Sequence, residues 1–124
     1  MTNRCALFEA LPAVATVFEG AQGVLLDERA GFSPHTTWSN CTFENAAALW
    51  AEVASHEPLS RWGVCRSHMV RHGPGPLPTE TRVLDGHIAH ESNIANRWQG
   101  PVRYGWFDAG LLRKSLALCG PVDA

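Results

Sequence analysis

The sequence predicts an α/β fold, with a partial mixed sheet, flanking helices and long loops. An apolar, partly β-branched run from Val14 to Glu19 is typical of a buried strand. Apolar residues then recur at helical spacing from Phe43 to Ala54, and a second apolar run from Trp62 to Met69 predicts another strand. Strands that alternate with helices along a chain indicate a sheet packed against helices.

The N-terminal part is expected to hold two shorter features. Residues 3–11 are expected to form a short helix that Pro12 ends, because proline cannot continue a helix. Leu25-Leu26 is expected to form one helical turn after the first strand. A long loop from Arg29 to Cys41 follows, and its glycine, proline, serine and asparagine residues are typical of irregular structure.

Capping residues place the two longer helices. Thr42 is a suitable N-cap for the first, and Glu44 in its first turn is favourable to the helix dipole. That helix is expected to end before Pro58. The last helix is expected to begin after the N-cap Asp108 and to run through Cys119.

Residues between the second apolar run and the last helix give weaker signals. Arg82–Leu84 and His87–Ala89 are weak strand candidates on either side of a turn at Asp85-Gly86. Two tryptophans in apolar surroundings, Trp50 and Trp106, are expected in the core. The tryptophans in loops, at positions 38 and 98, are expected to anchor those loops or to stack on a base.

Length and composition indicate one domain over residues 1–124. The chain has ten basic and twelve acidic residues, for a net charge of −2, which argues against nucleic acid or an anionic membrane as a partner. No apolar run approaches the roughly 20 residues that span a bilayer, so a cytoplasmic location is expected. The four cysteines are irregularly spaced, which is typical neither of a disulfide framework nor of a C-x-x-C site.

Four sequence blocks occur in an order and at a spacing that resemble one known family. They are FEGAQGVLLD at 18–27, GFSPHTTWSN at 31–40, VRHGPGPLPTE at 70–80 and RYGWFD at 103–108. The chain resembles the adenylosuccinate synthetase family in these blocks, which span most of its length. The resemblance implies purine biosynthesis, with GTP phosphorylating the 6-oxygen of IMP and the amine of aspartate displacing that phosphate.

Other parts of that family's pattern are absent. No GDEGKG-like phosphate loop occurs, and the single lysine, Lys114, does not begin a lysine-x-aspartate guanine motif. GTP and Mg²⁺ are therefore implied only by the resemblance, and no catalytic residue is assigned. The chain resembles a central slice of the fold that is expected to be inactive alone. The alternative is a non-catalytic module that binds a purine nucleotide or another protein.

The resemblance implies a set of substrate-binding residues. Gln22 would contact the purine, the Thr37 hydroxyl the 5′-phosphate, and the backbone at His72 and Gly73 the ribose. Arg103 aligns with the last arginine of the family's aspartate loop. That loop's paired threonines are missing here, so aspartate as the second substrate stays open.

Each of these residues also has a purely structural interpretation. Gln22 would then be a turn glutamine, Thr37 would fix its own loop, and Asn40, a weaker substrate-binding candidate, would cap the following helix. The Gly73-Pro74-Gly75-Pro76 run would be a rigid loop.

The histidines do not predict a metal site. His68 with His72, and His87-x-x-His90-Glu91, lack the helical context that a motif such as H-E-x-x-H requires. The expected partners are an IMP-like purine nucleotide and either a second copy of the chain or a complementing GTP-binding chain. An exposed sheet edge would favour such association.

Overall fold

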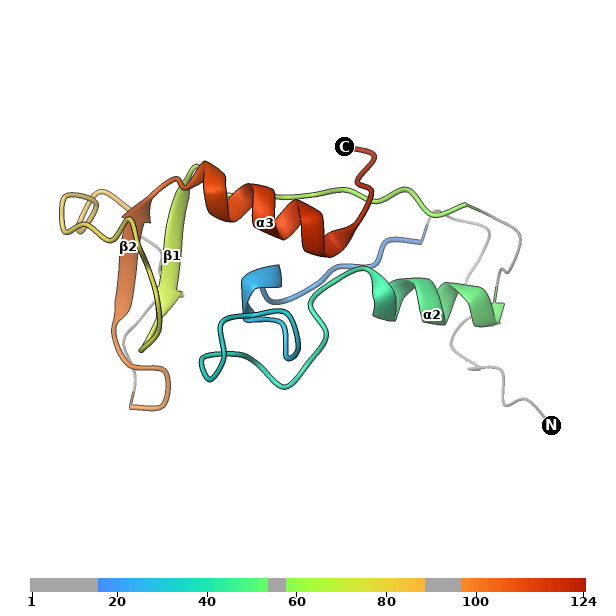
Figure 1. The fold of residues 1–124 in the computed structure, drawn as a ribbon, viewed down its shortest axis with the longest axis horizontal. Helices are drawn as coiled ribbons and strands as arrows, with labels where there is room; N and C mark the ends of the chain where they lie inside the picture. Colours follow the sequence, from blue (N-terminus) through green and yellow to red (C-terminus); the bar gives the residue numbers. More distant parts are fainter. Residues whose placement is uncertain (1–15, 54–57, 89–96) are drawn as a thin grey trace.

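The computed structural model describes residues 16–53, 58–88 and 97–124. In chain order it contains a 3-10 helix η1 (Val24–Leu26), helix α2 (Glu44–Val53), strands β1 (His68–His72) and β2 (Val102–Trp106), and helix α3 (Ala109–Cys119). The two strands lie at one end of an elongated molecule and α2 at the other, with η1 and α3 between them (Figure 1). The predicted α/β class is confirmed.

Strands β1 and β2 pair antiparallel, with Met69 opposite Gly105. On the other side of β2, Glu80 forms an isolated bridge to Gly105. The Trp106 N–H donates to the Thr79 carbonyl at 3.0 Å. A Cβ on Gly105 would lie 2.9 Å from that carbonyl oxygen, so this close approach requires glycine. Among the described residues, the sheet therefore has two antiparallel strands.

The predicted strands were placed wrongly. Of the first, residues 14 and 15 lie outside the described residues, and Thr16–Glu19 form no strand, with Val17 85% exposed. Of the second, only His68 and Met69 lie in β1, which begins six residues later than predicted. A strand persists only where a neighbour pairs with it, and the register of β2 reaches no further than His68.

Strand β2 itself was missed, although Val102, Tyr104 and Trp106 alternate as strand residues do. The weak strand candidates at Arg82–Leu84 and His87–Ala89 are wrong, although residue 89 lies outside the described residues. Residues 82–88 form successive turns, with Asp85 N–H bonded to the Arg82 carbonyl at 3.0 Å. The predicted turn at Asp85-Gly86 is confirmed.

The helix predictions were more accurate. The Thr42 hydroxyl accepts a 3.3 Å hydrogen bond from the Glu44 N–H, and α2 ends before Pro58 as expected. The Asp108 carboxylate accepts from the Leu111 N–H at 3.0 Å and caps α3, which ends at Cys119. The turn at Leu25-Leu26 is confirmed as η1. The helix expected at 3–11 lies outside the described residues.

The described residues bury little apolar surface. Helix α3 packs against η1, and the Lys114 ammonium lies 4.2 Å from the centroid of the Phe32 ring. Leu77 is the one buried large hydrophobic residue in residues 16–53, 58–88 and 97–124. Trp106 is 53% exposed, so its expected core position is wrong, and Trp38, at 99%, anchors nothing.

Candidate functional site

A cleft of about 620 Å³ is formed by three separate parts of the chain. Residues 21–26 with Phe32 form one wall, and residues 64–66 and 68–72 form another. The beginning of α3, with Leu111 and Leu112, supplies a third. The volume lies within the range of roughly 300–1,000 Å³ that is typical of small-molecule sites.

Gln22 lies on the first wall, exposed and two residues before η1. The turn behind it is closed by the Leu26 N–H, which donates to the Gly23 carbonyl at 2.8 Å. A Cβ on Gly20 or Gly23 would meet nothing within 4 Å, so the packing of the chain itself does not require glycine at either position. Both positions leave open space in which a ligand can approach the backbone.

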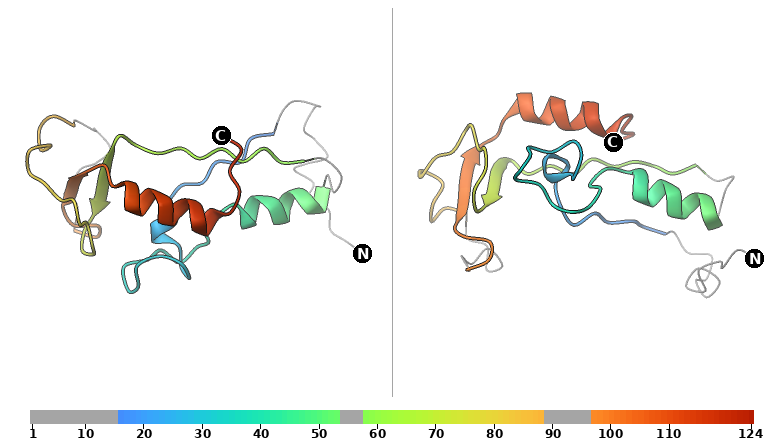
Figure 2. Two further views of the ribbon diagram at one scale, coloured as in Figure 1. Left: turned by 45° about the horizontal axis from the view of Figure 1, so that its top comes forward. Right: turned by 60° about the horizontal axis from the view of Figure 1, so that its bottom comes forward.

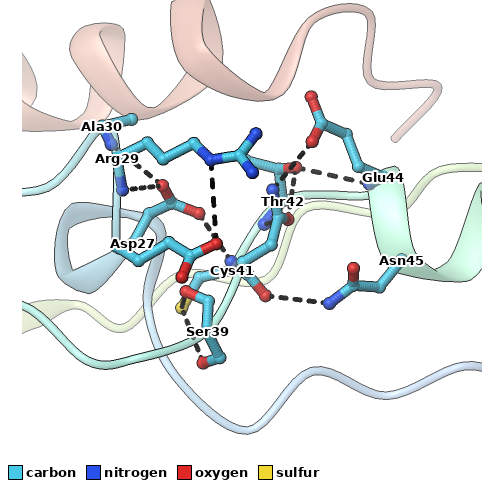
Figure 3. A network of polar contacts seen from close by, with 10 residues as sticks. Asp27, Arg29, Ala30, Ser39, Cys41, Thr42, Glu44 and Asn45 are labelled. Atoms are coloured by element: carbon cyan, nitrogen blue, oxygen red, sulfur yellow. Dashed lines mark hydrogen bonds and ion pairs between the residues drawn. The ribbon is translucent and has the colours of Figure 1, made fainter.

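Asp27, at the end of η1, organises the loop that follows. It is 1% exposed, and its carboxylate accepts backbone hydrogen bonds from Arg29 at 2.8 Å, Ala30 at 2.9 Å and Cys41 at 2.7 Å (Figure 3). The bond to Cys41 joins residues 14 positions apart, so Asp27 closes the whole loop. This network accounts for how a long loop without regular structure holds one shape.

The same contacts change two pKa values. Three hydrogen bonds, first that from the Cys41 N–H, stabilise the charged carboxylate and lower the pKa of Asp27 below 3.8. Burial, and secondarily the nearby negative charges, raise the pKa of the Cys41 thiol. The loop therefore contains a persistent carboxylate and a protonated thiol at neutral pH.

Thr37 and Asn40 lie in this loop, and neither lines the cleft. The Thr37 N–H donates to the Leu26 carbonyl at 2.7 Å, which holds the loop against η1. The side-chain oxygen Oδ1 of Asn40 accepts from the Thr42 N–H at 2.8 Å, and the side-chain Nδ2 donates to the Glu44 carboxylate at 2.8 Å. Asn40 thus orders the residues at the entry to α2 through Thr42 and the Glu44 side chain.

Arg71 on β1 joins the second sequence block to the third. Its Nη2 donates to the His35 carbonyl at 3.0 Å, and its Nε donates to the Pro74 carbonyl at 2.9 Å. Desolvation, and then repulsion by Arg103, lowers the pKa of Arg71. A Cβ on Gly75 would overlap this guanidinium group, so the side chain fixes a loop position that only glycine can occupy.

His72 is the last residue of β1, and Gly73 follows directly after it. His72 is half-buried and lines the cleft, as does His68. Gly73 is buried with φ +67°, and its N–H donates to the Pro101 carbonyl at 2.9 Å. A Cβ at this position would overlap the Gln99 carbonyl oxygen, so both backbone conformation and space require glycine.

The guanidinium group of Arg103 on β2 binds other residues of the chain. Nε and Nη2 donate to the two Glu80 carboxylate oxygens at 2.9 and 2.5 Å. Nη1 donates to the carbonyls of Gly73 at 2.9 Å and Gly75 at 3.0 Å. The ion pair lowers the pKa of Glu80 and raises that of Arg103. Arg103 therefore fixes the Gly-Pro-rich loop, and it lines a smaller cavity of about 470 Å³.

The structure thus divides the six predicted residues into three groups. Gln22 and His72 line the large cleft, Gly73 and Arg103 line the smaller cavity, and Thr37 and Asn40 line neither. Three contributors were not proposed from the sequence, namely Asp27, Arg71 and His68. The position of a carboxylate directly after a helical turn could have indicated Asp27. The arginine of the R-x-G run could have indicated Arg71.

Within the described part of the chain, no group of three or more His, Cys, Asp or Glu side chains lies close enough to hold a metal ion. His68 and His72 are four residues apart on one face of a strand, a separation of about 13 Å, which is too far to share an ion. His90 and Glu91 of the other histidine motif lie outside the described residues. None of the helices described here is long and apolar enough to cross a membrane.

Comparison with known proteins agrees with this arrangement of sequence blocks. The sequence profile of the adenylosuccinate synthetase family matches residues 6–123. Adenylosuccinate synthetase of Nitrosomonas europaea is 39% identical over 117 residues, which are 92% of this chain and 27% of that protein. The enzyme of Methylibium petroleiphilum is 35% identical over 112 residues, and that of Staphylococcus epidermidis 38% over 109. Each of these two alignments covers 86% of this chain and 25% of the relative.

The chain therefore spans about a quarter of the length of the curated relatives that it matches. The match extends over nearly all of the chain, including the residues around the cleft and the loop that Asp27 closes. The chain belongs to the adenylosuccinate synthetase family.

Proposed function

We propose that residues 1–124 form the IMP-binding side of an adenylosuccinate synthetase site, in which aspartate is ligated to IMP at the expense of GTP. The observation that carries this proposal is the placement of Gln22 and His72 on one cleft of about 620 Å³. These residues come from two different sequence blocks, 50 positions apart, and a shared nucleotide accounts for their convergence.

The chemistry of the cleft supports a purine as its occupant. Apolar residues such as Val24, Leu25 and Val70 line it, with a few polar groups among them, which is the usual composition of a small-molecule site. Gln22 offers both a donor and an acceptor, as the edge of a hypoxanthine ring requires. His68 also lines the cleft, and its Nε2 atom is buried without a hydrogen-bond partner among the described residues.

The other predicted residues act in this proposal through the loops. Thr37 would offer its hydroxyl to the 5′-phosphate from the loop that Asp27 closes, and Asn40 would set the end of that loop. The backbone at His72 and Gly73 would contact the ribose. Arg103 would act as a positioning residue, because Glu80 and two carbonyls occupy its donors.

GTP and Mg²⁺ do not fit the residues present. The sequence has no glycine-rich phosphate loop, and the described residues form no cluster of carboxylates that would bind a magnesium ion. No step of the reaction is therefore assigned to side chains of residues 1–124. The GTP-binding elements would be supplied by polypeptide outside these residues, in a cytoplasmic complex, and residues 1–124 would be inactive alone.

A second candidate is a module that binds a purine nucleotide or another protein without catalysis. The internal use of Arg103 favours it, since this leaves no described arginine fork on the β1–β2 sheet free to hold a carboxylate substrate. Both candidates share the nucleotide cleft, so the first experiment addresses binding.

That experiment is thermal unfolding of the chain with and without IMP. Ligand at about 100 times its dissociation constant stabilises a protein by roughly 2.7 kcal/mol, which raises Tm by about 10 °C at this size. Gln22→Ala is expected to abolish the shift. Glu52→Ala, which removes an exposed side chain of the same length from α2, is expected to retain it. A cooperative transition that IMP does not move would contradict nucleotide binding.

A further inference from the structure

The nucleotide proposed for the cleft carries a phosphate group, which needs a positively charged partner. The proposed function gives this group the neutral hydroxyl of Thr37, which does not line the cleft. A phosphate monoester carries more than one negative charge at neutral pH, and lysine and arginine side chains are its usual partners. A cation close to the cleft is therefore expected.

The two arginines that line the cleft are poorly placed for this contact. Arg71 donates from Nη2 to the His35 carbonyl and from Nε to the Pro74 carbonyl. Arg66 precedes His72 by six residues, which is about 20 Å along extended chain and too far from the ribose contacts proposed there. A phosphate next to that ribose needs a cation from another element.

Helix α3 supplies such a cation. The helix lies beside η1 and the loop that follows it (Figures 1 and 2), and its residues Leu111 and Leu112 line the cleft. Lys114 is three positions after Leu111 and so lies on the same face of the helix. Its ammonium lies 4.2 Å from the centroid of the Phe32 ring, and Phe32 also lines the cleft. The single lysine of the chain is thus held beside a wall of the cleft.

The ammonium group of Lys114 can accept an anionic ligand. The residue is exposed, and it forms no ion pair with a carboxylate of any residue that the structure describes. An ammonium has three N–H donors, and an aromatic face attracts the cation without using all of them. The ring therefore orients the ammonium while donors remain for a phosphate oxygen.

The loop that contains Phe32 brings this ammonium towards the proposed ribose contacts. The Phe32 carbonyl accepts from the His35 N–H at 2.8 Å, and the His35 carbonyl accepts from Arg71 at 3.0 Å. Arg71 directly precedes His72, whose backbone is proposed to contact the ribose. A short series of contacts therefore connects Lys114 with the part of the cleft in which the 5′-carbon of the nucleotide would lie.

We infer that Lys114 binds the 5′-phosphate of the nucleotide in the cleft, with the Phe32 ring holding its ammonium in position. This inference rests on the proposed function, and it names the residue through which the cleft selects a nucleoside monophosphate over a nucleoside. The Thr37 hydroxyl, from the same loop as Phe32, is a second donor in this arrangement.

The test measures the affinities of IMP, inosine and inorganic phosphate for residues 1–124 by isothermal titration calorimetry. The wild type is expected to bind IMP roughly tenfold or more tightly than inosine, as one charge-assisted contact provides. Lys114→Gln is expected to reduce this preference to about threefold or less and to leave the affinity for inosine unchanged. Inorganic phosphate alone is expected to bind more weakly than IMP.

Two variants serve as matched controls. Arg113→Gln removes the same charge from the neighbouring exposed residue of α3 and is expected to keep the preference for IMP. Lys114→Arg retains the charge and is expected to keep most of that preference. Thermal unfolding of each variant without ligand shows whether the fold is intact.

Several results would overturn the inference. An unchanged preference in Lys114→Gln would show that the lysine only packs on Phe32, and equal losses in Lys114→Gln and Arg113→Gln would assign the effect to net charge. Inorganic phosphate that binds as tightly as IMP would indicate a general anion site. Equal binding of IMP and inosine by the wild type would overturn this inference alone, whereas binding of neither would overturn the proposed function with it.

Discussion

The loops around Asp27, Arg71 and Arg103 differ sharply from the extended segments at residues 16–22 and 58–66. In the loops, buried or half-buried charged side chains hold backbone groups that are distant in sequence. In the extended segments, apolar side chains lie in solvent. These polar networks are complete within the described residues, whereas the core of a sheet needs neighbouring strands. The loops therefore keep their internal bonds, while the extended segments at residues 16–22 and 58–66 form no strand.

Among substitutions in the loops, Asp27→Asn is expected to lower the stability most. The NH₂ group of asparagine would face a backbone N–H that now donates to the carboxylate. That N–H would lose its acceptor. Tm is expected to fall by on the order of 10 °C. Glu28→Gln, at the exposed neighbouring carboxylate, is the control, and calorimetry measures both. Equal Tm values for the two variants would mean that Asp27 does not hold the loop.

Gly73→Ala compared with Gly86→Ala separates crowding from backbone strain. Both glycines have positive φ, +67° and +81°, but only at Gly73 would the Cβ overlap another group, the Gln99 carbonyl. Gly86→Ala is expected to cost about 1 kcal/mol of unfolding free energy through strain, and Gly73→Ala about 2 kcal/mol or more. Urea unfolding measures both, and similar losses would contradict the close packing at Gly73.

Arg103→Lys tests whether a positive charge alone can hold the Gly-Pro-rich loop. Lysine retains the charge but cannot form the fork that binds both Glu80 oxygens while also reaching two carbonyls. The expected loss is roughly 1–2 kcal/mol. Arg82→Lys, at an exposed arginine in the neighbouring turn, is expected to change stability by less than about 0.5 kcal/mol. An Arg103→Lys variant as stable as the wild type would show that charge is sufficient.

Acid is expected to weaken the loop network progressively. The lowered pKa of Asp27 means that the folded chain binds this proton less tightly than the unfolded chain does. The resulting stabilisation is complete above about pH 4 and is lost as pH falls through the lowered pKa, and Glu80 contributes with the same sign. The Tm of Asp27→Asn should therefore decline less below pH 4 than that of the wild type. Parallel declines would assign the acid sensitivity to other groups.

The smallest change in stability is expected from a substitution in the extended segment at residues 58–66. Trp62→Ala removes a large apolar side chain, but Trp62 is 69% exposed, so the unfolding free energy of the isolated chain should change by less than about 0.5 kcal/mol. Leu77→Ala, at the buried leucine, is expected to cost about 2 kcal/mol or more. Urea titration of the two variants gives the contrast, and a large loss from Trp62→Ala would show that its segment is already packed.

The sequence by itself determined the features that depend on neighbouring residues. Helix caps at Thr42 and Asp108, the turn at Asp85-Gly86 and the family blocks were readable because each is defined within a few positions. The choice of Gln22 and His72 as candidate substrate-binding residues followed from the family resemblance rather than from local pattern.

Only the tertiary structure decided which apolar runs become strands and which charged residues hold the loops. Val14–Glu19 and Trp62–Met69 have strand composition, but a strand exists where a partner pairs with it, and β2 reaches only His68–His72. Likewise, Arg103 could be predicted as a substrate ligand, whereas its contacts with Glu80, Gly73 and Gly75 depend on residues 23 to 30 positions away. Local propensity sets what a segment can form, and distant partners determine what it does form.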